Sequence, residues 1–463
     1  MQDINRRSFI SKSTAASAGV IVGLPIVTKS YAKSSPNDTI NIAMIGTRIR
    51  WQKLFPALAN VPNVRIVTLC DIDQRLLPEA VSAVEALTGH KPKTETEYRK
   101  VLEDKHIDAV VISTPNHWHA LQTIWACQAG KDVYVEKPVS HTIVEGRKMV
   151  EAARKYNRVV QAGTQSRSST GMIDAIKFLH EGRLGELYMV KGLCLKPRAS
   201  IGHTIDSEIP IGVNWDTFLG PAPYRPFNEN RFHYKWHWFW DTGNGDLGNQ
   251  GPHQTDIARW ALNIRTHPIK ISGVGKIYVW DSDQETPNTQ HIEFEYEDGR
   301  IIQFEVRGMA SNPEAGIRIG NIYFGHKGWM GTNHTDGRTS QVHYTDIKLQ
   351  PNGFSSYKEE IGPIFSDKPR DVVDYVKPEV EEALILHFQN FIDCVRSRKW
   401  QDLNGEILDG HLSSSLCHLG NIACRLNRTL EFNPNSEKFV NDEEADSYLT
   451  KMYRAPYLLP EKV

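Results

Sequence analysis

The stretch that decides the fold reads TINIAMIG and covers residues 39–46. A short, almost continuous run of Ile, Ala and Met that ends on glycine is typical of a buried parallel strand entering a tight turn. A second apolar run, VRIVTLC at residues 64–70, ends at Asp71, and residues 52–59 between the two runs have helical character. A strand, a glycine turn, a helix and a second strand that ends on an acid form the arrangement of a dinucleotide-binding domain.

Three further apolar runs extend this pattern, and they are AVVIST (109–114), DVYV (132–135) and VVQAG (159–163). A helix predicted over about 142–156 separates the last two runs. Strands that alternate with helices imply right-handed crossovers and a parallel sheet. The sequence therefore predicts a doubly wound Rossmann domain over residues 39–165.

Beyond residue 165 the pattern changes to strands that alternate apolar and polar residues. Such runs occur at 269–274, 291–296 and 300–306. Glu297-Asp298-Gly299 predicts a tight turn between the last two runs. Amphipathic helices are expected over 380–397 and 411–425. The chain is thus predicted to be an α/β domain followed, over 166–463, by an α+β domain with a mostly antiparallel sheet.

Length and composition agree with a globular protein of more than one domain. The chain has 463 residues, which is too long for one ordinary core, and its formal net charge is −1. A balance so close to neutral excludes a protein that attracts nucleic acid through its phosphates. Six cysteines are scattered without a metal-like spacing, so we expect buried free thiols and no metal site.

The first 32 residues have the features of an export signal. Arg6-Arg7, followed by SFI and Lys12, forms a twin-arginine region, and residues 13–27 are short and mildly apolar. A membrane anchor is the alternative, but about fifteen residues are too few to cross a hydrocarbon core of roughly 30 Å. We expect cleavage after Ala32, a polar linker over 33–38, a periplasmic or otherwise exported protein, and no membrane span in the mature chain.

The glycine turn departs from the usual dinucleotide motif. A G-x-G-x-x-G frame that starts at Gly46 would require glycines where the chain has Arg48 and Trp51. Arg48 could supply a guanidinium to a pyrophosphate, or Arg48 and Trp51 could fill the site. Asp71 is at the usual distance for binding a ribose 2′-hydroxyl, and its charge favours NAD over NADP.

Glu136-Lys137-Pro138 follows the predicted strand 132–135, at the edge where open parallel sheets bind ligands. A lysine there can place a cation beside a substrate oxygen. The alternative is that Lys137 is a solvated charge at a strand end. Residues 116–120 (NHWHA) and 163–165 (GTQ) are expected to end the neighbouring strands and to face the same crevice.

A second candidate lies far along the chain, in the glycine-rich stretch GNGDLGNQGPHQTD at 243–256. Pro252 suits the first position of a helix, so His253 is expected in the first turn. The helix dipole there keeps an imidazole neutral and able to accept a proton. A histidine that is only packed at a helix start is the alternative.

These residues resemble the Gfo/Idh/MocA oxidoreductases, in Glu136-Lys137-Pro138, in the NHWH segment at 116–119 and in the stretch that leads to His253. The resemblance covers nearly the whole chain after the leader. It implies a Rossmann domain joined to a sheet domain that binds substrate and mediates oligomerisation, here residues 166–463, as well as sugar or polyol substrates and a homo-oligomer. It also implies that Lys137 and His253 are catalytic. The family often has an aspartate where this chain has Asn249, and this departure, with Arg48 and Trp51, puts ordinary dehydrogenase turnover in question.

The implied chemistry is removal of a hydroxyl proton by His253 while a hydride passes to NAD, with Lys137 stabilising the oxygen. The aromatic run at 232–240 could stack on sugar faces, although core or interface packing explains any one ring equally well. The expected catalytic residues are Lys137, His253 and Asn249. The expected cofactor contacts are Gly46, Thr47, Arg48, Ile49, Asp71, Thr114, Pro115, Asn116, His119, Glu136, Lys137 and Gln165. The expected substrate contacts are Arg167, Trp236, Trp238, Asp241 and His253.

Three functions follow, and the sequence favours them in this order. The first is an exported oxidoreductase that acts on a secondary hydroxyl of a sugar, polyol or glycoside with tightly bound NAD. The second is a glycosidase that uses NAD transiently, through a keto-sugar. The third is a sugar-binding relative without redox activity whose cofactor loop has decayed.

Overall fold

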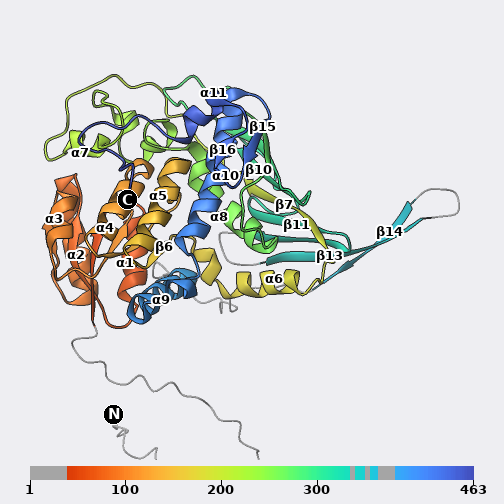
Figure 1. Ribbon diagram of the computed structural model, residues 1–463, viewed down its shortest axis with the longest axis horizontal. Coiled ribbons are helices and arrows are strands. Elements are labelled where there is room, and N and C mark those ends of the chain that lie inside the picture. Colours follow the sequence, from red (N-terminus) through yellow and green to blue (C-terminus); the bar gives the residue numbers. More distant parts are fainter. Residues whose placement is uncertain (1–38, 334–338, 350–354, 363–380) are drawn as a thin grey trace, which may run out of the picture. The chain divides into compact units, whose positions relative to one another are not determined.

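The computed structural model describes residues 39–333, 339–349, 355–362 and 381–463 (Figure 1). Both the expected export signal at 1–32 and the linker at 33–38 lie outside the described residues. Residues 39–463 form one compact unit, so the expected boundary between domains at residue 165 stays a prediction.

Six parallel strands form the first sheet, in the order β3-β2-β1-β4-β5-β6. Its strands are β1 (Ile40–Ile45), β2 (Val64–Cys70), β3 (Lys93–Glu95), β4 (Ala109–Ile112), β5 (Asp132–Val135) and β6 (Val160–Ala162). The helices of this part are α1 (Trp51–Ala59), α2 (Leu77–Thr88), α3 (Tyr98–Glu103), α4 (Asn116–Gln128) and α5 (Ile143–Lys155). The predicted doubly wound sheet is confirmed, and its order reverses between β1 and β4, where such sheets bind ligands.

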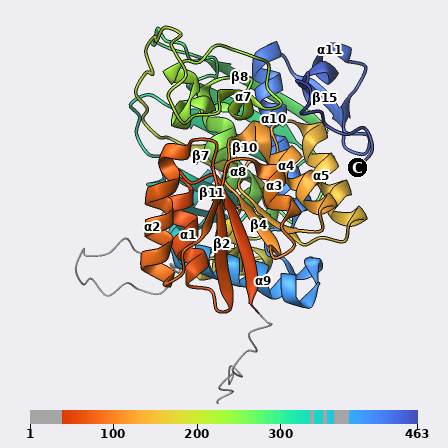
Figure 2. The same cartoon turned by 90° about the vertical axis from the view of Figure 1, so that its left-hand side faces the viewer.

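Both faces of this sheet are covered, which is why its strands are apolar throughout. In β1, Ile42 and Met44 belong to a core with residues of α1 and α2, and Ile45 belongs to a second core with residues of α3, α4 and α5. Figure 2 shows α1 and α2 on one side of the strands and α4 and α5 on the other. The first core is completed from far along the chain by α9 (Glu382–Ser397), through residues such as Phe388 and Phe391.

The second sheet has ten strands, in the order β14-β13-β12-β11-β7-β10-β9-β8-β15-β16. Its first strands are β7 (Leu187–Cys194), β8 (Lys270–Lys276), β9 (Thr289–Glu295), β10 (Ile301–Arg307) and β11 (Ile319–Gly325). The remaining strands are β12 (Gly328–Asn333), β13 (Thr339–Leu349), β14 (Ser355–Ile361), β15 (Leu430–Asn433) and β16 (Lys438–Phe439). Among the described strands of this sheet, β7 and β10 pair in parallel and the other pairs are antiparallel, so the predicted, mostly antiparallel character is confirmed.

The helices of the second part are α6 (Thr170–His180), α7 (Trp215–Leu219), α8 (Gly245–Ala261), α10 (Ile407–Leu426) and α11 (Glu443–Asp446). Short 3-10 turns lie at η2 (Gln74–Leu76), η3 (Gln165–Ser168), η4 (Glu229–Arg231), η5 (His233–Trp238), η6 (Trp400–Asp402) and η7 (Ser447–Leu449). One apolar core joins α8 and α10 to the second sheet, and Figure 1 shows both helices beside it.

Two details correct the sequence interpretation. The NHWH segment does not end a strand, because Asn116 opens α4 directly after Pro115. His253 is not in the first turn of its helix either: α8 begins at Gly245, and Pro252 lies inside it. Gly245, Gly248 and Gly251 are therefore helical, and the dipole argument for a neutral His253 is wrong.

The described residues add two plain facts. All six cysteines are buried and free, as expected. Among these residues no helix combines the length and the apolar character that crossing a membrane requires.

Candidate active site

A cavity of about 440 Å³ lies at the carboxyl ends of the strands in the first sheet. The turns after β1, β2, β4 and β5 line it, together with segments of the second part of the chain. Among the residues expected to bind cofactor or substrate, the cavity brings together Gly46, Thr47, Arg48, Ile49, Asp71, Thr114, Pro115, Asn116, His119, Glu136, Lys137, Trp236 and Asn249. Four strand-end turns and two helical segments that are distant in sequence thus meet where the sheet order predicts a ligand.

The glycine turn after β1 is tight enough to require glycine at its first position. Gly46 has φ +85°, and a Cβ atom there would lie 2.9 Å from the carbonyl oxygen of Ser113. An L-residue at this position would have a strained backbone, and its Cβ would collide with Ser113, the residue that follows β4. The turn therefore keeps the close approach of β1 and β4 that a dinucleotide site needs.

Arg48 and Trp51 replace the other two glycines of the motif, and their side chains lie in different places. Trp51 begins α1, is 4% exposed, and stacks on Phe55 with ring centroids 4.3 Å apart. Its ring belongs to the apolar core and does not line the cavity. Arg48 does line the cavity, where Asp73 and Asp71 face its charge. The interpretation in which Trp51 fills the site is therefore wrong. The structure agrees with the other interpretation, in which Arg48 supplies a cation beside a pyrophosphate.

Asp71 holds the turn as well as lining the cavity. Its Oδ2 accepts hydrogen bonds from the backbone N–H of Thr47 (2.7 Å) and from the Thr47 hydroxyl (2.9 Å), and its Oδ1 accepts one from the N–H of Asp73. Burial raises the pKa of Asp71, and the hydrogen bonds from Asp73 and Thr47 oppose that shift. Residues Gly46 and Asp71 thus fit a dinucleotide with a free ribose 2′-hydroxyl.

The second part of the chain closes over this end of the cavity. Residues 212–214, here called the strap, pair with residues 72–74 just beyond β2. The N–H of Gln74 donates to the Gly212 carbonyl (2.9 Å), and the N–H of Asn214 donates to the Ile72 carbonyl (3.0 Å). His233 lines the cavity beside the strap, with Nε2 at 3.3 Å from Asp73.

Sequence reasoning missed Arg50, which lies on the cavity opposite Glu136. The Arg50 Nε and the Glu136 Oε1 are 2.7 Å apart, and Glu136 is 4% exposed. The Arg50 Nη2 also lies 3.5 Å from the Gln165 Oε1, so Gln165 contacts the site through Arg50 and does not line the cavity itself. The signal was present in the sequence, because Arg50 falls inside the altered glycine frame.

Lys137 connects the two parts of the chain at the cavity. Its Nζ donates to the backbone carbonyl of Asn249 at 2.6 Å and lies 3.3 Å from the Asn249 Oδ1. Burial lowers the pKa of Lys137 to about 8, with a further reduction from the charges of Arg50 and Lys196, although Glu136 opposes it. An ammonium has three N–H groups, so one remains for a ligand oxygen after the contacts with Asn249.

His237 also lines the cavity and was noticed in the sequence only as part of the aromatic run. Its Nδ1 lies 2.5 Å from the backbone carbonyl of Tyr234, so Nδ1 carries the proton and donates it. The ring stacks on Trp236 with centroids 3.7 Å apart. Burial lowers the pKa of His237 to about 3, and Lys137 adds to that shift. The imidazole is therefore neutral, with the lone pair on Nε2.

Besides Gln165, four residues expected in the site do not line the cavity. Arg167 forms a two-point ion pair with Asp256, at 2.7 and 2.9 Å. Asp241 pairs with Arg225 at 2.6 Å. Trp238 is buried beneath the Arg198 guanidinium, 5.2 Å from its ring centre. His253 is buried one helical turn beyond Asn249.

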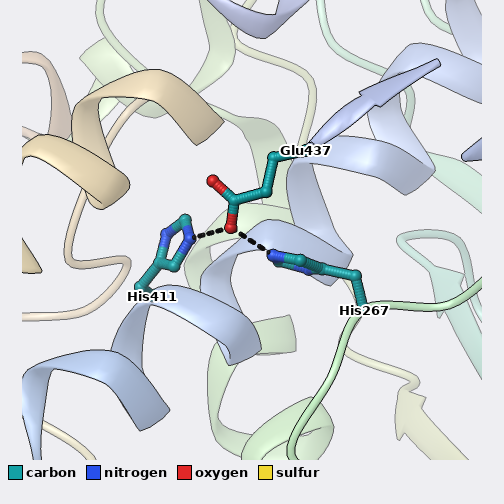
Figure 3. Close-up of side chains that lie close together, drawn as sticks. All are labelled: His267, His411 and Glu437. Atoms are coloured by element: carbon teal, nitrogen blue, oxygen red, sulfur yellow. Dashed lines mark hydrogen bonds and ion pairs between the residues drawn. The ribbon is translucent and has the colours of Figure 1, made fainter. Parts of the chain in front are cut away.

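One group of side chains among the described residues has ligands suited to a metal ion, and Figure 3 shows it. His267 and His411 each place Nε2 within 2.8 Å of the same Glu437 oxygen. Arg147 also donates to Glu437 (3.0 Å from Nε to Oε2), so a cation already neutralises that carboxylate. Metal-bound histidines usually donate their other N–H, but the buried His267 Nδ1 has no hydrogen-bond partner among the described residues. This donor pattern favours a hydrogen-bonded cluster of neutral imidazoles around a carboxylate.

Comparison with known proteins gives the site a context. Residues 40–164 match the family described as "Oxidoreductase family, NAD-binding Rossmann fold". Residues 200–328 and 365–459 match the description "Oxidoreductase family, C-terminal alpha/beta domain". Both descriptions belong to the Gfo/Idh/MocA oxidoreductases, and together they take in most of the chain.

Curated relatives include two proteins named "Glycosyl hydrolase family 109 protein". The one from Shewanella baltica (strain OS155) is 27% identical over 207 residues, which are 40% of this chain and 45% of the relative. The one from Shewanella pealeana is 25% identical over 202 residues, 40% of this chain and 44% of the relative. The chain thus spans less than half the length of these relatives.

Solved structures with the same fold include a levoglucosan dehydrogenase in complex with NADH and levoglucosan. Its TM-score is 0.60 at 17% identity, over 85% of this chain and 99% of that chain. An aldose-aldose oxidoreductase from Caulobacter crescentus, complexed with glycerol, has a TM-score of 0.58 at 19% identity, over 85% of this chain and 100% of that chain. A cavity at the strand ends, bordered by Gly46, Asp71 and Lys137, and two matching family domains lead to one conclusion: this chain belongs to the Gfo/Idh/MocA family of oxidoreductases, with an NAD-binding Rossmann fold.

Proposed function

We propose that the protein oxidises a secondary hydroxyl of a sugar, polyol or glycoside, with a tightly held NAD, after export by the twin-arginine route. The observation that carries the proposal is the contact between Lys137 and Asn249 at the cavity wall. It leaves one N–H of a half-buried ammonium for a substrate oxygen, where the Rossmann part of the chain meets α8. The bound nicotinamide would supply the hydride acceptor.

Lys137 stabilises the substrate oxygen as negative charge develops on it. The ammonium is partly desolvated, so its hydrogen bond to an alkoxide-like oxygen is stronger than it would be in water. Because Asn249 is neutral, it positions the Lys137 Nζ without removing the charge that this role needs. The lowered pKa of Lys137, about 8, also brings it within reach of proton transfer near neutral pH.

His237 is our candidate for the group that accepts the hydroxyl proton. Its Nε2 is unprotonated, because the Tyr234 carbonyl fixes the proton on Nδ1, and the ring lies on the cavity. A general base must be within hydrogen-bond reach of the proton that it removes. His253, the residue indicated by the family resemblance, stays the alternative base, one turn further along α8.

Retention of the cofactor is supported by the strap. Two backbone hydrogen bonds hold residues 212–214 to the segment that follows Asp71, where the adenosine ribose would bind. A cofactor enclosed in this way leaves slowly, so each reduced cofactor would be re-oxidised in place by a second substrate. Such a cycle suits an exported enzyme outside any free NAD pool.

The test is the small molecule that accompanies the purified protein. We expect nicotinamide nucleotide to be released from the denatured protein and identified by mass, in a molar ratio near one. Addition of sugars should then change the nicotinamide absorbance in the native protein, and a Lys137→Ala variant should retain nucleotide but lose this response. Absence of bound nucleotide, together with no binding of added NAD, would overturn the proposal.

A second candidate function is a glycosidase that uses NAD transiently, and the curated relatives named for glycosyl hydrolase family 109 favour it. The first step would be the same oxidation beside Lys137. It differs in its outcome, because a glycoside would be cleaved with no net redox change and a ring hydrogen would exchange with solvent. Product analysis with a glycoside in deuterated water separates the two functions. We also propose, from the family resemblance alone, that the protein forms a homo-oligomer.

A further inference from the structure

A chain of buried amide groups connects the cavity wall to the start of α8. The Asn116 Nδ2 donates to the Asn244 Oδ1 at 2.9 Å, and the Asn244 Nδ2 donates to the His141 carbonyl at 3.1 Å. From α10, the Asn421 Nδ2 donates to the backbone carbonyl of Asn244 at 2.9 Å. Asn116 lines the cavity and is 2% exposed, whereas Asn244 is buried outside the cavity lining.

These contacts determine which way each amide faces. An amide oxygen only accepts hydrogen bonds and an amide nitrogen only donates them. Because the His141 carbonyl can only accept, the Asn244 nitrogen faces it, and the Asn244 oxygen faces Asn116. Asn116 must in turn present its nitrogen to that oxygen. Its own Oδ1 is then the acceptor that remains, and no hydrogen bond to it is formed within the described part of the chain.

Asn244 makes this contact in place of a common structural one. It is the N-cap of α8, a position at which asparagine usually accepts a hydrogen bond from the second or third helical N–H. Here the side chain makes no capping hydrogen bond. Glycine follows at position 248, where a Cβ would overlap the Asn244 Cβ. The helix thus leaves room for a side chain whose oxygen is used on Asn116, which indicates that the orientation of Asn116 has a function.

Asn116 and Lys137 reach α8 from neighbouring strand ends. Asn116 opens α4 after β4 and contacts Asn244, and Lys137 follows β5 and contacts Asn249. Five residues along a helix axis correspond to about 7.5 Å, so the two contacts are close together. The Asn116 amide therefore lies at the same end of the cavity as the Lys137 ammonium. A ligand group that meets the remaining oxygen of Asn116 must offer an N–H or an O–H.

We propose that the Asn116 Oδ1 accepts a hydrogen bond from the carboxamide N–H of the nicotinamide, and that Asn244 is the positioning residue that holds Asn116 for this contact. The carboxamide is the neutral N–H donor on the ring that accepts the hydride. Asn116 belongs to the strand-end turns of the Rossmann part that line the cavity. This inference rests on the NAD binding in the proposed function and names the residues that select the carboxamide and fix the rotation of the ring beside Lys137.

Competition between two nucleotides on the full-length holoprotein tests the contact. The protein is incubated with equal excesses of NAD and 3-acetylpyridine adenine dinucleotide, in which a methyl group replaces the amide nitrogen. After exchange, the bound nucleotides are quantified by mass. We expect about tenfold more bound NAD or above, the order of the cost of leaving a buried acceptor unsatisfied. ADP-ribose, which has no nicotinamide, is exchanged in the same way and reports damage to the rest of the site.

Variants assign the preference to the two asparagines. Asn116→Ala and Asn244→Leu should each reduce the bound ratio of NAD to the acetyl analogue by about tenfold and leave ADP-ribose binding unchanged. A merely structural role would weaken all three nucleotides alike. Asn244→Asp should keep the preference, because a carboxylate oxygen still accepts from the Asn116 Nδ2. Asn435→Leu, at an exposed asparagine outside the cavity lining, is the matched control and should leave the ratio unchanged.

The outcomes separate this inference from the proposed oxidation. A bound ratio near one in the unaltered protein, or a preference that survives in Asn116→Ala, would overturn the contact, whether or not Asn244→Leu folds. A preference that is lost in Asn116→Ala and kept in Asn244→Leu would overturn the role of Asn244. The expected preference without any absorbance response to sugars would support this inference and contradict the oxidation. Failure to bind any of the nucleotides would overturn both.

Discussion

Lys137 donates a hydrogen bond from one domain to the other, from its Nζ to the backbone carbonyl oxygen of Asn249 at 2.6 Å. The acceptor lies in α8, three residues before Pro252, which lacks a backbone N–H and so interrupts the hydrogen bonds of the helix at this turn. The position of the ammonium therefore depends on how α8 packs against the Rossmann domain. Changes at either end of this contact should alter the ionisation of Lys137 before they alter the fold.

Asn249→Asp should move that ionisation to higher pH. A carboxylate 3.3 Å from the Nζ would stabilise the ammonium and raise the pKa of Lys137 from about 8 toward its ordinary value. The alkaline limb of kcat/KM against pH should shift upward by about one unit or more. Asn249→Ala serves as the control, since it removes the amide and adds no charge. If the alkaline limb of the pH profile is unchanged in Asn249→Asp, the group that titrates in that limb is not Lys137.

Lys137→Met should abolish turnover and stabilise the protein at neutral pH. The pKa of Lys137 is lowered on folding, so the charged form is disfavoured in the fold below about pH 8. That cost falls as the pH rises from about 8 toward the ordinary lysine value, and it is absent above it. Replacement by an apolar side chain of similar length should therefore gain on the order of 1–3 kcal/mol at pH 7. Denaturant unfolding at pH 7 and again near the ordinary lysine pKa checks both the sign and the loss of the gain.

The two candidate bases can be separated by equivalent substitutions. His237→Asn should lower kcat by about a hundredfold or more, since it removes the Nε2 acceptor on the cavity wall. His253→Asn should have a smaller effect on kcat, because that ring is buried behind Asn249 and does not line the cavity. Nucleotide content of both variants is the control for folding. A larger loss of kcat in His253→Asn than in His237→Asn would identify His253 as the base.

Asp71→Ser should weaken the binding of NAD and reduce the discrimination against NADP. The carboxylate would no longer repel a 2′-phosphate or bind a ribose hydroxyl, and it would no longer orient Thr47. Calorimetry on nucleotide-free protein should show NAD affinity reduced by about tenfold or more, the order of one lost charged hydrogen bond. Thr47→Val keeps the Asp71 carboxylate but removes the hydroxyl that donates a hydrogen bond to it. This variant should therefore weaken the binding of NAD without favouring NADP.

Val213→Asn should make the protein lose its nucleotide faster. Val213 packs beside Ile72 against the aromatic cluster of Trp215 and Phe232, so a polar side chain there would loosen the strap. The measurement is the amount of nucleotide that remains after repeated desalting, followed over time. Val279→Asn alters an exposed valine elsewhere and should leave retention unchanged. Equal retention in both variants would mean that the strap does not hold the cofactor.

Much of the Rossmann domain could be predicted from the sequence, because buried parallel strands are short apolar runs with clear ends. The predictions for β2 (Val64–Cys70) and β5 (Asp132–Val135) match the structure residue for residue. The short edge strand β3 (Lys93–Glu95) is polar and partly exposed, so it has no apolar run to reveal it. The start of α8 was misplaced because glycine and proline usually mark helix ends, whereas here close packing requires small residues: a Cβ on Gly251 would lie 2.8 Å from the Cys417 Sγ.

The site was only partly predictable. Strand-end residues such as Asp71 and Lys137 could be identified, since their place follows from sheet topology. Residues that reach the cavity from elsewhere could not: Arg50 and His237 need the fold to bring them there. The burial of Trp51 and the exposure of Arg48 to the cavity could not be separated by composition either, because both replace a glycine of the same motif.

The return of α9 to the first sheet has a consequence for how the chain is made. Leu384, Phe388 and Phe391 complete an apolar core whose other members, such as Ile42 and Trp51, leave the ribosome more than three hundred residues earlier. During synthesis α1 and α2 can cover only part of that face, and the part that awaits α9 is an exposed apolar surface that invites aggregation or capture by a chaperone. The Rossmann domain, although continuous in sequence, therefore completes this core only after α9 (Glu382–Ser397) has been made.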